Sequence, residues 1–76
     1  MSAPLSGRPV KRSLTLRGHR TSVSLEDAFW REFRHQAEAE GVALNALAQR
    51  IDEGRGEVGL ASAIRVWVLE RVLERR

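Results

Sequence analysis

Cysteine is absent from the 76-residue sequence, and only two histidines occur, His19 and His35. The chain therefore has no disulfide, no thiolate ligand and no thiol nucleophile. Neither histidine has a cluster of acidic residues at metal-ligand spacing, so we expect no metal site and no cofactor. Ser22 and Ser24 have no candidate partners for a catalytic triad, and the sequence has no glycine-rich phosphate loop. These absences predict a protein that is not an enzyme.

Long apolar runs are also absent. No stretch approaches the roughly 20 apolar residues of a membrane span, and residues 1–9 lack the apolar core of a signal peptide. We therefore expect a cytoplasmic protein that does not contact a membrane. A single domain of this length buries a small fraction of its surface, and no disulfide is available to stabilise it, so oligomerisation is the remaining route.

Acidic residues are missing from the first 25 positions, which carry a formal charge of +5. The rest of the chain holds all ten acids and eight arginines, a net charge of −2. The basic residues of the first segment are Arg8, Lys11, Arg12, Arg17 and Arg20. This asymmetry favours binding to a polyanion, with DNA or RNA ahead of a membrane surface, and a solvated tail is the alternative. We divide the chain into a disordered basic leader, residues 1–10, and a folded domain, residues 11–76.

Two short segments, residues 12–16 and 20–25, alternate apolar with polar residues, which is typical of half-buried strands. The apolar positions are even-numbered in the first segment and odd-numbered in the second. One straight strand cannot place both sets on the same face, so a bulge or turn is expected near Gly18.

A two-residue loop made of Gly18 and His19, in a type II′ turn, would resolve this difference. Leu16 would then lie opposite Thr21, with the apolar residues of both strands on one face. The other face would be polar and partly basic. Its residues are Ser13, Thr15, Arg17, Arg20, Ser22 and Ser24.

Three helical segments follow the strands. The first is expected to begin where Ser24 caps the free amides and Asp27 completes a capping-box-like pair, and to end at Gly41. The second ends at Gly54, and residues 54–59, with three glycines, form a flexible connection. The apolar stripes of these helices consist of Phe29, Phe33 and Ala37 in the first and Leu44, Leu47, Ala48 and Ile51 in the second.

The third helical segment, from about residue 60 to residue 75, has apolar residues around most of its circumference. Such a helix must be buried on more than one side, and a chain this small achieves that by packing against a partner subunit. The sequence therefore predicts an obligate homodimer. Trp30 and Trp67 lie beside core positions, which favours packing over stacking on bases.

From residue 20 to about residue 54 the sequence reads RTSVSLEDAFWREFRHQAEAEGVALNALAQRIDEG. This segment resembles the ribbon-helix-helix proteins of the Arc and MetJ repressor superfamily. The resemblance lies in the order of the parts: a short alternating strand, a capped amphipathic helix, a glycine turn and a second helix. The continuation LASAIRVWVLERV resembles a bacterial subgroup that adds a third helix. The implied fold class is mainly α with a short N-terminal β segment, a possible extra N-terminal strand and a third C-terminal helix.

This resemblance implies a homodimer whose paired strands enter the major groove of double-stranded DNA, while the second helices grip flanking phosphates at their N-termini. The base-reading residues would be Arg20, Ser22 and Ser24. Family members commonly carry Ser or Thr at the start of the second helix, where this chain has Ala43, Leu44 and Asn45. The phosphate grip would therefore rely on backbone amides or on Asn45. Further phosphate contacts are expected from Lys11, Arg12, Arg17 and His19.

The upstream run, residues 12–16, is an addition to the family pattern. If it pairs with the main strand, the dimer has a four-stranded sheet, which is too wide to enter the groove as a ribbon does. Residues 12–16 are then either a flexible arm on DNA or a sign that the ribbon serves another purpose.

Two functional classes remain. The first is a sequence-specific DNA-binding transcriptional regulator. The second is a protein-interaction module, an antitoxin or adaptor, that holds a protein partner through the third helix. An exposed, basic face around Arg17, Arg20 and Ser22 would favour DNA, and a large uncovered apolar patch on the third helix would favour a protein partner.

Overall fold

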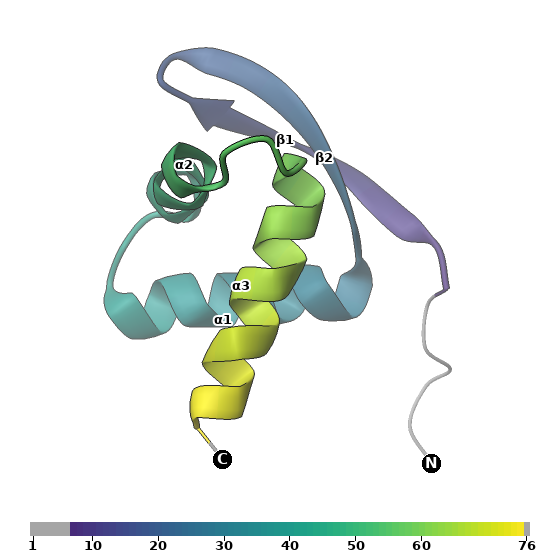
Figure 1. The fold of residues 1–76 in the computed structure, drawn as a ribbon, viewed down its shortest axis with the longest axis vertical. Coiled ribbons are helices and arrows are strands. Elements are labelled where there is room, and N and C mark those ends of the chain that lie inside the picture. The colour runs from purple at the N-terminus through teal and green to yellow at the C-terminus, as the bar shows by residue number, and fades with distance from the viewer. Residues whose placement is uncertain (1–6, 76) are drawn as a thin grey trace.

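The computed structural model describes residues 7–75 and shows an antiparallel hairpin followed by three helices (Figure 1). The elements are β1 (Pro9–Leu16), β2 (His19–Glu26), α1 (Asp27–Glu40), α2 (Leu44–Gly54) and α3 (Leu60–Glu74). This order confirms the predicted fold class, including the additional strand and the third helix. Residues 1–6 of the predicted leader lie outside the described part of the chain, and β1 already begins at Pro9. No helix within residues 7–75 is long and apolar enough to cross a membrane.

The hairpin turn consists of Arg17 and Gly18, because Leu16 pairs with His19. Both turn residues have positive φ, 52° and 79° respectively, which is the signature of a type I′ turn. The predicted type II′ turn at Gly18 and His19 is therefore wrong, and the register differs by two residues. A shift of two preserves side-chain parity, so the same side chains still share a face.

The inner face of the hairpin closes a core that all three helices share. Trp30 and Phe33 are fully buried, with ring centroids 6.3 Å apart, and Phe33 meets Trp67 edge-on at 6.3 Å. The Trp30 indole Nε1 donates to the Val10 carbonyl at 2.8 Å, which ties α1 to β1. The buried apolar residues are Leu14, Leu16, Val23, Leu25, Trp30, Phe33, Ala37, Leu47, Ala48, Ile51, Ile64 and Val68.

Helix α1 begins later than the capping pattern predicts. Its N-cap is Glu26, with no side-chain cap hydrogen bond, whereas Ser24 lies within β2 opposite Lys11. The predicted Ser24 cap is therefore wrong, because the chain stays extended through Glu26. The predicted end at Gly41 is confirmed. Gly41 has φ 70° and, together with Val42, donates backbone hydrogen bonds to the last turn of the helix in a Schellman arrangement.

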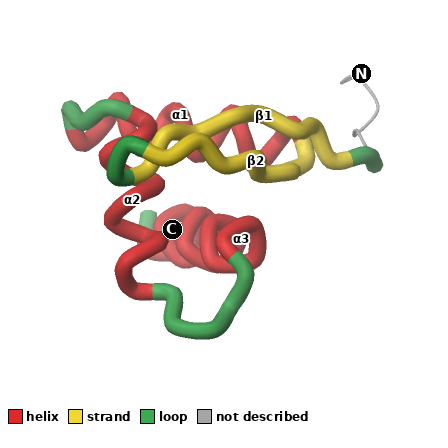
Figure 2. The backbone as a smooth tube through the Cα atoms, turned by 90° about the horizontal axis from the view of Figure 1, so that it is seen from above, coloured by secondary structure: helices red, strands yellow, loops and turns green. Residues whose placement is uncertain are grey.

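Helix α3 crosses α1 and contributes to the core with one side only (Figure 1). Ile64 and Val68 are buried, whereas Val66, Leu69 and Leu73 are each about half exposed, at 54, 53 and 47%. Seen from above, the hairpin and α1 lie on one side of the molecule and α3 on the other (Figure 2). The chain therefore completes one core by itself and leaves a second apolar stripe uncovered.

Candidate nucleic-acid interface

The outer face of the hairpin is the face that points away from the core. Strand alternation places Lys11, Ser13 and Thr15 of β1 on it. Register pairs them with Ser24, Ser22 and Arg20 of β2, respectively. All of these residues are exposed except Ser24, which is half-buried. The structure therefore brings the predicted base-reading residues together with three polar residues of β1 on one surface.

Arg12 belongs to the opposite face. It pairs with the buried Val23, and its guanidinium lies 5.8 Å from the centroid of the Trp30 ring, within cation–π range. Arg12 lies two residues before the buried Leu14, and in a strand this spacing places both side chains on the inner face. The sequence therefore contained a signal that Arg12 does not share the face of Lys11. Arg12 therefore covers the edge of the core and does not project with Lys11.

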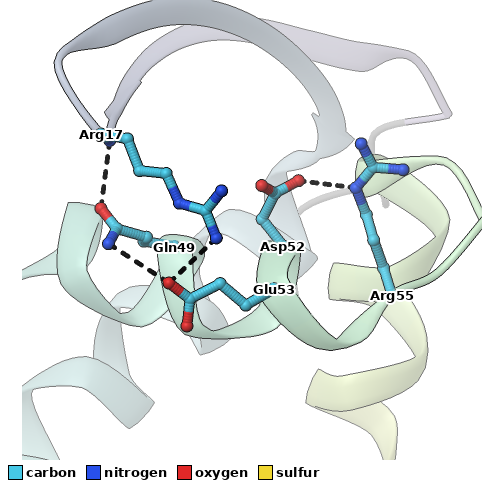
Figure 3. A network of polar contacts seen from close by, with 5 residues as sticks. All are labelled: Arg17, Gln49, Asp52, Glu53 and Arg55. Carbon is cyan, nitrogen blue, oxygen red and sulfur yellow. Dashed lines mark hydrogen bonds and ion pairs between the residues drawn. The ribbon is translucent and has the colours of Figure 1, made fainter.

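Arg17 is held at the turn by the side chains of α2 (Figure 3). Its backbone N–H donates to Gln49 Oε1 at 3.1 Å, and its guanidinium forms an ion pair with Glu53 at 3.1 Å. Gln49 Nε2 also donates to the Glu53 carboxylate, at 3.5 Å. The backbone hydrogen bond supports the left-handed conformation of Arg17, which costs free energy in a residue other than glycine. The ion pair is exposed, at 59 and 49%, so an external phosphate can compete for the guanidinium.

The start of α2 has no side-chain cap, since Ala43 is the N-cap and makes no such hydrogen bond. Leu44 is half-buried and Asn45 is exposed. Asn45 Oδ1, which the sequence offered for phosphate contact, accepts a hydrogen bond from the Thr15 N–H at 3.1 Å. Asn45 and Gln49 are four residues apart and therefore share one face of α2, from which they bind two backbone N–H groups of the hairpin. Sequence reasoning missed this role because the contacts span 30 and 32 residues.

These hydrogen bonds establish which backbone groups face away from the hairpin. Thr15 lies directly opposite Arg20, and the Thr15 N–H points toward α2. In an antiparallel ladder, the two residues of a directly opposed pair either both bond to each other or both point outward. The backbone N–H and C=O of Arg20 therefore point to the far side of β2. By alternation, so do those of Ser22 and Ser24.

The two edges of the hairpin differ. Along β1, the outward positions are Pro9, Lys11, Ser13 and Thr15. Pro9 has no N–H, Lys11 is charged, and the Thr15 N–H is bound by α2, whereas no residue of the described chain binds the outward N–H of Ser13. Proline, lysine and a covering helix are the devices by which proteins block strand pairing. Along β2, no residue of the described chain takes the outward backbone groups of Arg20 or Ser22.

The end of the β2 edge is bound by α3. Arg65 Nη2 donates to the Ser24 carbonyl at 3.3 Å, and Arg65 Nε forms an ion pair with Glu26 at 2.9 Å. The hydrogen bond from Arg65 holds the pKa of the Glu26 carboxyl below its ordinary value. A carbonyl oxygen has two lone pairs, so Ser24 can still accept a second hydrogen bond.

A second surface lies between α2 and α3, where a hollow of about 370 Å³ is lined by Ile51, Val58, Val66 and Trp67 among others. Val66 lines the hollow and also belongs to the uncovered stripe of α3, so the two surfaces adjoin. Within residues 7–75, no group of three or more His, Asp or Glu side chains is placed to hold a metal ion.

Comparison with known proteins supports the resemblance. A family model described as a ribbon-helix-helix domain matches residues 9–72. The match begins at Pro9, so it includes β1, which the sequence analysis treated as an addition, and it extends through most of α3. Searches of curated proteins and of solved structures gave no match.

Proposed function

Because the chain belongs to the ribbon-helix-helix family, whose members generally bind DNA as dimers and are typically regulators without enzyme activity, we propose that it is a DNA-binding transcriptional regulator that acts as a homodimer. Such a protein acts in the cytoplasm, where bacterial DNA lies. The observation that carries the proposal is the outer face of the hairpin, on which Arg20 and Ser22 are exposed beside an open strand edge and Ser24 is half-buried.

The dimer forms through the β2 edges of two copies. A two-fold axis at Ser22 lets Ser22 of one copy exchange both backbone hydrogen bonds with Ser22 of the other, and lets Arg20 pair with Ser24. On the inner face, this register sets Thr21 of one copy against Val23 of the other, which keeps apolar surface toward the core. The edge of β1 is protected at Pro9, Lys11 and Thr15, so β2 offers the more open edge for this pairing.

The paired β2 strands read the base edges. Arg20 is long enough to reach into the major groove and to donate two hydrogen bonds to guanine. Ser22 and Ser24 lie at the centre of the paired strands, where hydroxyl groups bond to several bases. Flanking phosphates are contacted by Lys11, by Arg17 once it leaves Glu53, and by His19 beside the turn. The first backbone amides of α2, at Leu44 and Asn45, supply a further contact.

Fluorescence anisotropy of labelled duplexes across a salt series tests this function. Lys11 and Arg17 contact phosphates in each copy, and Arg20 brings a further cation into the groove, so the dimer releases the counterions of about four to six phosphates. The log–log salt slope should then be about −3.6 to −5.4. Arg20→Ala should cost about 1–3 kcal/mol on a selected site and relax its preference. Arg34→Ala, which removes an exposed cation of α1, is the control.

A second candidate function is favoured by the uncovered stripe of α3, formed by Val66, Leu69 and Leu73. An antitoxin or adaptor would hold its protein partner on this stripe and in the adjoining hollow. Absence of duplex binding by the wild-type dimer, even at low salt, would favour this candidate over the regulator.

A further inference from the structure

The width of the sheet poses a steric problem for the regulator. Strands lie about 4.8 Å apart, so the β2 axes of the dimer lie about 2.4 Å from the two-fold axis and the β1 axes about 7 Å from it. The major groove is about 12 Å wide, which leaves about 6 Å on each side of its centre. The two β2 strands therefore face the open groove between its walls, whereas each β1 strand lies over one of the walls. These walls are the phosphate backbones.

We propose, resting on the DNA-binding function above, that β1 is the phosphate-gripping strand of the dimer and that β2 alone reads bases. Lys11, Ser13 and Thr15 bind the phosphates on both walls of the groove. On the outer face, the residues of β1 therefore contact DNA phosphates and the residues of β2 contact bases. Each cross-strand pair joins one residue of each kind.

The side chains of β1 suit this position. Ser13 and Thr15 are short and exposed, so the strand backbone can approach the phosphates closely, and their hydroxyl groups donate hydrogen bonds to phosphate oxygens. Lys11 is exposed and supplies a positive charge toward the far end of the strand. None of these three groups distinguishes one phosphate from another, so they add affinity without sequence preference.

The other polar groups that could contact phosphates near β1 already have partners within the protein or lack a hydroxyl group, which supports the assignment of phosphate binding to β1. The Asn45 side chain is bound to the Thr15 N–H, and the start of α2 offers no hydroxyl group. Arg12 is stacked on Trp30. The Asn45 hydrogen bond also anchors β1 to α2, so the strand is fixed when the Thr15 hydroxyl meets a phosphate.

Anisotropy measurements on full-length Lys11→Ala and Thr15→Val test the proposal, with a selected duplex, a random duplex and a salt series. Thr15→Val keeps the β-branched shape and removes only the hydroxyl. Lys11→Ala should reduce the magnitude of the salt slope by about 1.8, since each copy loses one phosphate contact. Thr15→Val should weaken binding to both duplexes about 30-fold, because the dimer loses two hydrogen bonds of about 1 kcal/mol each. Neither variant should change the ratio of the two affinities.

Arg34→Ala again controls for the loss of a cation elsewhere, and circular dichroism checks the fold. The proposal is overturned if Lys11→Ala and Thr15→Val differ no more than Arg34→Ala from the wild type, or if their losses are confined to the selected duplex. Failure of the wild type to bind any duplex at low salt would overturn the DNA-binding function itself, together with this inference. The two failures are therefore distinguishable.

Discussion

A pair of proline substitutions tests whether the open edge of β2 forms the dimer. Ser22 and Ser13 lie directly opposite each other, both are exposed, and both direct their backbone N–H away from the hairpin. Proline at either position therefore leaves the hydrogen bonds between β1 and β2 intact. Both variants also carry the same strain, since proline fixes φ near −65° within a strand.

The two variants should differ in the dimer. β2 becomes a central strand on pairing, and proline is found essentially only on edge strands, whereas β1 remains an edge. Ser22→Pro removes both N–H donors at the two-fold axis, since each copy carries the substitution. Two hydrogen bonds at about 1 kcal/mol each predict a loss of at least about 2 kcal/mol, or about 30-fold in Kd. Ser13→Pro should leave the dimer unchanged.

Sedimentation equilibrium over a range of concentrations measures the dimer Kd for the wild type and for both variants. Circular dichroism should show that both variants keep their helical content. Equal dissociation of Ser13→Pro and Ser22→Pro would refute the assignment of the interface to β2. So would a Ser22→Pro protein that dimerises as tightly as the wild type.

Four further variants probe the fold by urea unfolding or thermal melting. Ile64→Ala should lower the free energy of unfolding by about 2–5 kcal/mol because it opens a cavity at a fully buried position, whereas Val66→Ala at a half-exposed position should cost far less. Gly18→Ala should cost about 1 kcal/mol, since φ is 79° and an added Cβ meets no atom within 4 Å. The lowered pKa of Glu26 means that its ion pair with Arg65 stabilises the fold above the ordinary carboxyl pKa, and that this contribution is lost as the pH falls through the lowered pKa. Glu26→Gln should therefore flatten the acidic decline in stability, and an unchanged decline would contradict this.

Residue periodicity predicted the elements and their faces because burial imposes it directly. Alternation with a change of parity identified both strands and their shared inner face, which Leu14 and Val23 confirm by their burial. Alternation repeats every two residues, so it cannot distinguish registers that differ by two. The register depends on the conformation of Arg17 and on the hydrogen bond that Gln49 makes to it, and both are tertiary features.

The candidate site was predictable where it depends on strand parity and not where it depends on distant contacts. Arg20 and Ser22 were placed correctly on the outer face from alternation alone. The hydrogen bond of Asn45 was not predicted, since its partner, the Thr15 N–H, lies on β1 and no local sequence pattern indicates a hydrogen bond to a strand edge. The Ser24 cap failed because a capping pattern also occurs where an extended strand runs directly into a helix.

Helix α3 changes the relation between folding and association. In a dimer whose subunits have no core of their own, folding and association are a single event, and stability depends on protein concentration. Here Trp30, Phe33 and Ile64 are fully buried within one copy, since α3 covers the core from its own chain. The apolar residues around α3 predicted an obligate dimer, whereas one side of this helix packs against the core of its own chain. Folding and strand pairing should therefore be separable, so that dissociation at the β2 edge leaves a folded hairpin with its three helices and removes only the paired strands that the proposed DNA binding requires.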